Sequence, residues 1–181
     1  MKKISFLIIA FVSLMVFSAF ASEDNLHHLF KDYSVIKIYL NNVEITASHD
    51  GEVNEKDFRE VFKEMAEKRI NIKFEPVDTA DQADVVVNAH IEEYVYRKRV
   101  LPRVTSMWAL IADGTRPKSM GKLRIDYEIT CPNHNNHKVA RENFITEERL
   151  PVEDMYKEIA FIHSARRNVN RFLYRTFYEQ K

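Results

Sequence analysis

The stretch Ala83–Tyr96 reads ADVVVNAHIEEYVY, and the rest of the chain is organised around it. Side chains of one parity are apolar: Val85, Val87, Ala89 and Ile91. The other parity begins apolar and turns polar: Val86, Asn88, His90 and Glu92. This period of two residues predicts the central strand of a sheet, buried on both faces at its start and on one face further along.

An amphipathic helical pattern at Asn54–Arg69 precedes this strand. Asn54 is a natural N-cap, and Val53 and Phe58 have the spacing of a hydrophobic staple. The apolar residues share one helical face: Phe58, Val61, Phe62, Met65 and Ala66. A helix of this kind covers a sheet, and nothing on it has a catalytic pattern.

A second helix is predicted at Val152–Tyr178, directly after Pro151. The residues expected to face the sheet follow the helical period: Met155, Ile159, Ile162, Val169, Phe172 or Leu173, and Phe177. A basic stripe repeats every fourth residue beside that face: His163, Arg167, Arg171 and Arg175. A solvated helix face is the favoured interpretation of the stripe, and contact with a headgroup or an acidic protein is the alternative.

Four further segments have the alternation of strands: Val35–Leu40, Ile70–Pro76, Lys122–Thr130 and Lys138–Thr146. Asn41 and Asn42 interrupt the first of them as a bulge or a turn, and both interpretations stay open. The order strand-helix-strand-strand-strand-strand-helix predicts an α+β domain. Because the later connections are short, we expect a mostly antiparallel sheet of roughly four to six strands with two helices packed on one face.

The first 21 residues have the pattern of a signal peptide. Lys2 and Lys3 precede the apolar run Ile4–Phe17, and Ala19–Ala21 supplies the small residues of a cleavage site. An uncleaved anchor helix is the less favoured alternative. We therefore expect residues 22–181 to form a single exported α+β domain without a transmembrane anchor, in the periplasm, with outer-membrane association left open.

Composition excludes several classes of protein. The chain has 27 basic and 27 acidic residues, and cleavage would remove Lys2 and Lys3, so a general nucleic-acid binder is not expected. Cys131 is the only cysteine, which permits no internal disulfide and leaves it buried, free or paired with another chain. With three glycines the chain has no dinucleotide-binding fingerprint, phosphate-binding loop or hydrolase elbow, so no cofactor is expected.

Two alternatives to a binding function remain. Cys131, His134 and His137 have a spacing that could ligate zinc or copper, but Pro132–Asn136 also suits a hairpin turn, which is the favoured interpretation. A small hydrolase-type enzyme, less favoured, would need one of four histidines beside a carboxylate such as Glu92 or Asp126 in a cleft. These histidines are His90, His134, His137 and His163.

The stretch Arg97–Met120 has an irregular pattern with basic and aromatic residues: Arg97, Lys98, Arg99, Arg103 and Trp108. It is either a hairpin of long strands with the run Met107–Ile111 buried, which is favoured, or a projecting loop. In the second case it would contact an anionic or amphiphilic partner.

The pattern of the chain resembles that of small envelope proteins of the LptE-like group and related periplasmic domains. The similar parts are Ala83–Asp84 leading into Val85–Glu92, and Leu123–Ile129 before a turn, a strand and a C-terminal helix. The acylated cysteine of that group is absent here. The resemblance implies an accessory role in envelope assembly.

Together these patterns predict an exported, non-enzymatic periplasmic binding or envelope-assembly accessory protein. Its partner would be an envelope protein or an anionic amphiphile. The expected contact residues are Arg97, Arg99, Arg103, Trp108, Arg167, Arg171 and Arg175.

Overall fold

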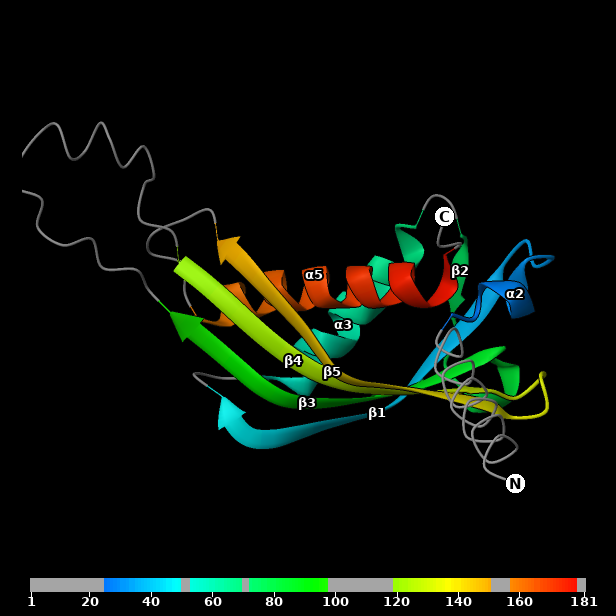
Figure 1. The fold of residues 1–181 in the computed structure, drawn as a ribbon, viewed down its shortest axis with the longest axis horizontal. Coiled ribbons are helices and arrows are strands. Elements are labelled where there is room, and N and C mark those ends of the chain that lie inside the picture. Colours follow the sequence, from blue (N-terminus) through cyan, green and yellow to red (C-terminus); the bar gives the residue numbers. More distant parts are fainter. Residues whose placement is uncertain (1–24, 50–52, 70–71, 98–118, 151–156, 179–181) are drawn as a thin grey trace, which may run out of the picture.

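The computed structural model describes residues 25–49, 53–69, 72–97, 119–150 and 157–178, and the signal-peptide prediction lies outside them. The strands are β1 (Ile36–His49), β2 (Phe74–Pro76), β3 (Val85–Arg97), β4 (Ser119–Cys131) and β5 (His137–Leu150). The helices are α2 (His27–Phe30), α3 (Glu55–Glu67) and α5 (Lys157–Phe177), with a 3-10 turn η1 (Ala80–Gln82). The five strands form one sheet, and the predicted order of strands and helices is confirmed (Figure 1).

The sheet order is β2-β1-β3-β4-β5, so β3 is the central strand as predicted. The predicted α+β class is confirmed, and the sheet is mixed rather than purely antiparallel. β1 is parallel to both β2 and β3, whereas β3–β4 and β4–β5 are antiparallel. The parallel pairing of β1 was not part of the prediction. The β2–β3 connection is short because β2 has three residues and spans only roughly 10 Å, so the chain returns over that distance without a crossover helix.

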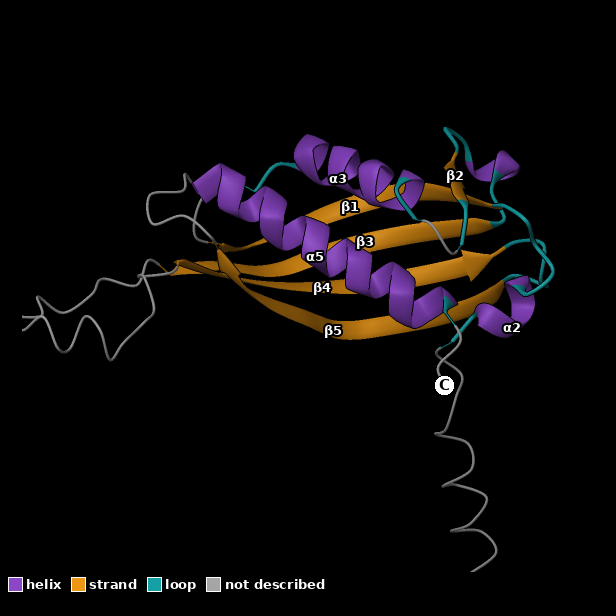
Figure 2. Cartoon of the chain, turned by 90° about the horizontal axis from the view of Figure 1, so that it is seen from above, coloured by secondary structure: helices purple, strands orange, loops and turns teal. Residues whose placement is uncertain are grey.

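Both long helices lie on one face of the sheet, as predicted (Figure 2). α3 contacts β1 and β2, and α5 contacts β3, β4 and β5. Along β3 buried residues therefore alternate with half-buried ones from Val85 to Glu92, and the alternation breaks at the bulge between Ile91 and Glu93. Val86 is half-buried, so the expected burial of both faces at the start of β3 is wrong: no described element covers the second face.

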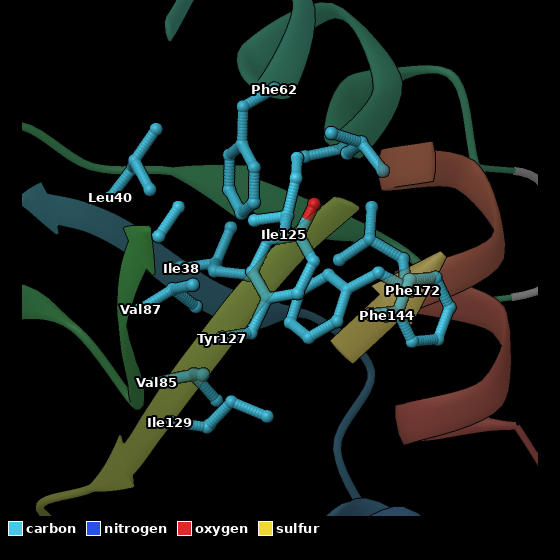
Figure 3. Close-up of a cluster of buried hydrophobic side chains, with 14 of the residues drawn as sticks. Ile38, Leu40, Phe62, Val85, Val87, Ile125, Tyr127, Ile129, Phe144 and Phe172 are labelled. Carbon is cyan, nitrogen blue, oxygen red and sulfur yellow. The ribbon is translucent and has the colours of Figure 1, made fainter. Parts of the chain in front are cut away.

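The core fills the layer between sheet and helices (Figure 3). The ring of Tyr127 on β4 stacks on Phe172 of α5 with centroids 3.9 Å apart, and Phe144 of β5 packs edge-on against both. On α3 the predicted apolar face is buried at Phe58, Val61, Phe62 and Ala66. The burial of these side chains is the main favourable contribution to folding.

Local sequence signals explain where α3 begins and how β1 continues. The Asn54 side chain accepts a 2.9 Å hydrogen bond from the Lys56 backbone N–H, which confirms the N-cap. The interruption of β1 is a bulge, since its pairing with β3 shifts register between Leu40 and Asn42.

One prediction for α5 is wrong. Ile159 is 44% exposed, and the neighbouring Ala160 and Phe161 are buried in its place. Phe172 and Leu173 are both buried, which settles the alternative between them, whereas Met155 lies outside the described residues. Among the residues that the structure describes, none of the helices combines the length and apolarity that a membrane-spanning helix needs.

Candidate functional site

The face of the sheet opposite the helices carries a polar hollow with a volume of about 590 Å³. Four carboxylates line it: Glu44, Asp126, Glu128 and Glu142. The other polar side chains in the lining are Asn41, Asn42, Asn88 and His90. We call it the acidic hollow, because no lysine or arginine is among the residues that line it.

An imidazole and two carboxylates come together at the edge of this hollow, where His90 and Asp126 line it and Glu92 does not. His90 on β3 lies opposite Asp126 on β4 and opposite Glu44 on β1. Glu92 lies two residues further along β3, at the bulge between Ile91 and Glu93, and is close to both His90 and Asp126. One ligand atom each of His90, Glu92 and Asp126 lies within 4.8 Å of the others, and all three side chains are half-buried.

Neighbouring groups hold the two carboxylates of this cluster. Glu92 Oε2 lies 2.6 Å from Arg124 Nε in an ion pair. Asp126 Oδ1 accepts a 2.5 Å hydrogen bond from the backbone N–H of Asn143. Asn143 has φ of 52° and lies at a register shift between β4 and β5, so a bulge turns its N–H toward Asp126. His90 Nε2, in contrast, is a buried atom without a hydrogen-bond partner among the described residues.

The cluster of His90, Glu92 and Asp126 has the arrangement that the hydrolase alternative needs, which is a histidine beside Glu92 or Asp126. The sequence names all three residues, but their proximity depends on the pairing of β3 with β4. That pairing spans a register shift between Ile91 and Glu93. The sequence gives only a weak signal for this cluster. His90 and Glu92 are two residues apart on one predicted strand, and Asp126 is on the polar face of another.

A second hollow, of about 460 Å³, lies on α5 and contains three members of the predicted basic stripe. Its lining residues are Met65, Glu148, His163, Arg166, Arg167, Asn170 and Arg171. We call it the α5 hollow. Sequence reasoning missed Arg166, because this residue lies one position away from the four-residue repeat.

Two of the three arginines at the α5 hollow have acidic partners. Arg166 donates to Glu64 Oε2 on α3 at 2.9 and 3.0 Å, and Arg167 lies 3.6 Å from Glu148. A hydrogen bond from Lys68, which has the largest effect, and hydrogen bonds from Arg166 lower the pKa of the Glu64 carboxyl. Arg171 is exposed and has no hydrogen-bond or ion-pair partner among the described residues.

The remaining predicted contact residues are not gathered at the α5 hollow. Arg175 lies over the Phe144 ring, with its guanidinium carbon 5.7 Å from the ring centroid. Arg97 is the exposed last residue of β3 and does not line the hollow. Arg99, Arg103 and Trp108 lie outside the described residues, as does the choice between a hairpin and a projecting loop.

The structure places Cys131, His134 and His137 in the β4–β5 hairpin, as the turn interpretation predicts. Asn135 and Asn136 have left-handed φ angles of 55° and 53°. The Cys131 side chain is fully buried, and burial raises the pKa of its thiol to about 11. The His134 ring packs edge-on against Phe30 with centroids 5.1 Å apart. These three residues do not form a metal-ligand cluster within the described part of the chain.

No protein-family model and no curated protein matches the sequence. Among solved structures the chain is similar to the hypothetical protein CT253 from Chlamydia trachomatis, with 12% identity, a TM-score of 0.48, and coverage of 77% of this chain and 96% of that chain. It is also similar to the PelC dodecamer from Paraburkholderia phytofirmans, with 11% identity, a TM-score of 0.45, and coverage of 80% and 90%. The rare lipoprotein B from Shewanella oneidensis has 12% identity, a TM-score of 0.31, and coverage of 74% and 91%. TM-scores below 0.5 at these identities carry no conclusion about function.

Proposed function

We propose that the chain is an exported, non-enzymatic binding protein of the cell envelope that holds the phosphate group of an anionic amphiphile at the α5 hollow. The observation that carries the proposal is Arg171, an exposed guanidinium without a partner among the described residues. It lies in a hollow that also contains His163, Arg166 and Arg167. The anionic partner is the one expected from the sequence. Of the expected contact residues, the proposed site uses those on one side of α5.

The chemistry of the α5 hollow favours phosphate. A guanidinium presents a planar fork of N–H donors that matches two oxygens of a phosphate, and such charge-assisted hydrogen bonds are strong. Arg171 has these donors available. Arg167, whose nearest carboxylate oxygen is 3.6 Å away and whose side chain is 41% exposed, can rotate to join it.

An amphiphile is favoured over an acidic protein by an exposed apolar residue beside the basic stripe. Ile159 lies four residues before His163, one helical turn away, and is 44% exposed. A lipid chain next to a bound headgroup would cover this isoleucine. An acidic protein surface would leave it without an apolar partner.

A non-enzymatic role is supported by the side chains available at the acidic hollow. None of the residues that line it is a serine, threonine, cysteine or lysine, so a hydroxyl, thiol or amine of these types is not available there for covalent catalysis. The hollow lies on an open sheet face, where water is not excluded from a reacting group. The Cys131 thiol is buried in the core and protonated at neutral pH.

Vesicle co-sedimentation tests the proposal. The chain should bind vesicles that contain phosphatidylglycerol and not vesicles of phosphatidylcholine alone. Because each arginine near an anionic surface contributes about 1 kcal/mol, the double variant Arg167→Gln/Arg171→Gln should bind roughly 30-fold more weakly.

The matched control removes two positive charges from the opposite face. Lys37 and Lys138 are exposed on the sheet face away from the helices, and Lys37→Gln/Lys138→Gln changes the net charge equally. This control should bind as the parent chain does. Equal loss in both double variants, or no preference for the anionic vesicles, would contradict a site at α5.

A further inference from the structure

We propose that His90, Glu92 and Asp126 form a binding site for a divalent metal ion of the zinc class on the open face of the sheet. This site lies on the opposite face from the α5 hollow, and it is independent of amphiphile binding.

Strand geometry places the three ligands on one side of the sheet. His90 alternates with the buried Ala89 and Ile91 on β3 and so points away from the helices. Glu92 lies at the bulge that follows, and its ion pair with Arg124 of β4 keeps it beside His90 on the same face. Asp126 is the cross-strand neighbour of His90 on antiparallel β4. Directly opposed residues in such a pair have Cβ atoms about 4.5–5.5 Å apart, close enough for both side chains to reach one ion.

The distances suit a shared ion. Bonds from zinc to nitrogen or carboxylate oxygen are about 2.0–2.2 Å long, so two ligand atoms on one ion are separated by at most about 4.4 Å. The three ligand atoms here already lie within 4.8 Å of one another. Small side-chain rotations therefore complete the geometry without a change of backbone.

The imidazole supplies an independent observation. His90 Nε2 is buried, and no described group donates to it or accepts from it. A buried polar atom without a partner costs free energy. A metal ion coordinated by this nitrogen removes that cost, and a neutral imidazole is the commonest metal ligand in proteins.

Outer contacts orient the carboxylate ligands. The Asn143 N–H holds one oxygen of Asp126 at 2.5 Å and leaves the other for an ion. Arg124 Nε lies 2.6 Å from Glu92 Oε2 in an ion pair that lacks hydrogen-bond geometry. Partners of this type fix the ligands of known metal sites.

The charges around the site favour a cation. Arg124 opposes metal binding by its positive charge. The negative charges of Glu44, Glu128 and Glu142 in the same hollow outnumber this one positive charge, so the surroundings of His90 are negative overall. A cation is attracted to such a surface, with a strength that falls as salt is added.

The ligand types select the zinc class over calcium or magnesium. Imidazole nitrogen suits zinc and its neighbours among the transition metals, whereas calcium takes six to eight oxygens and magnesium needs octahedral oxygen ligands. One nitrogen and two carboxylates leave a fourth tetrahedral position open. That position is available to water or to a side chain from a partner.

Isothermal titration calorimetry of the purified, chelator-treated chain with zinc chloride tests the site. We expect one equivalent of zinc to bind, with much weaker binding of calcium and magnesium. His90→Ala and Asp126→Asn should each weaken zinc binding at least ~10-fold, since loss of an outer-shell partner alone costs about 10–100-fold. Asparagine at position 126 still accepts the Asn143 hydrogen bond, so this variant is expected to fold.

His137→Gln is the matched control, because it removes a histidine from the β4–β5 hairpin. It should bind zinc as the parent chain does. A second readout is thermal denaturation: at equal zinc concentration, zinc should raise the melting temperature of Asp126→Asn by less than that of the parent chain or of His137→Gln. No stoichiometric zinc in the parent chain, or loss with His137→Gln and not with His90→Ala, would overturn the proposal. Vesicle binding stays unchanged in His90→Ala, so failure of one proposal leaves the other testable.

Discussion

The Tyr127 hydroxyl of β4 donates a 2.8 Å hydrogen bond to Asn168 Oδ1 of α5 inside the core. The Asn168 amide in turn donates to the Phe144 carbonyl and to Thr146 Oγ1 on β5, both at 3.1 Å. A polar side chain buried in an apolar layer is tolerated only when its hydrogen bonds are made. This network therefore fixes the position of α5 over β4 and β5, and with it the position of the α5 hollow.

Tyr127→Phe tests the contribution of this network to stability. The variant keeps the ring stacked on Phe172 but leaves Asn168 Oδ1 without a donor, so unfolding in urea should show a loss of about 1–3 kcal/mol. Tyr174→Phe is the control, because Tyr174 is 50% exposed on the same helix. A loss of equal size in both variants would contradict a buried network.

Asp84 joins three segments at one end of the sheet. Its carboxylate accepts from the Lys37 backbone N–H and from the Asn133 side chain, both at 2.9 Å. Asp84→Ala should lower the free energy of unfolding by roughly 1–3 kcal/mol, because the Lys37 N–H and the Asn133 amide lose an ionised acceptor. Asp81→Ala, an exposed aspartate on η1, should change it by less than about 0.5 kcal/mol.

The Cys131 thiol gives the fold a pH dependence on the alkaline side. Burial raises the pKa of this thiol from 9.0 to about 11, so the folded state keeps a proton that the unfolded chain loses. The contribution is fully present below pH 9 and is lost as pH rises from 9 to 11. Its full size is roughly 2–3 kcal/mol.

Urea titrations between pH 8 and 11 measure this effect. Relative to Cys131→Ala, the parent chain should lose stability across that interval. Parallel pH profiles for the two proteins would show that Cys131 does not titrate differently on folding. A thiol reagent should also modify Cys131 slowly in buffer and rapidly in denaturant.

Elements of this fold could be predicted from sequence where side-chain periodicity is strong. The alternation in Ala83–Tyr96 and the helical period at Asn54–Arg69 each correspond to a structural element, β3 and α3. The direction of strand pairing could not be predicted in this way, because periodicity is identical in parallel and antiparallel strands. Ile159 was misplaced because it fits the helical period at the edge of the buried face, where burial depends on the crossing of α5 over the sheet.

The two candidate sites differ in how far sequence could locate them. His163, Arg167 and Arg171 follow the period of a single helix, so their common surface was predictable from the sequence. The cluster of His90, Glu92 and Asp126 requires the register of β3 against β4, and bulges shift that register. A one-residue difference in pairing would move Asp126 away from His90.

Photo-crosslinking at single positions measures the site of amphiphile contact most directly. A photoreactive phenylalanine replaces Asn170, an exposed residue that lines the α5 hollow, or Lys138 on the opposite face. The chain is irradiated with phosphatidylglycerol vesicles, and adducts are identified by mass spectrometry. We predict a lipid adduct at position 170 and none at position 138. Adducts of equal yield at both positions, or at position 138 alone, would contradict a specific phosphate site on α5.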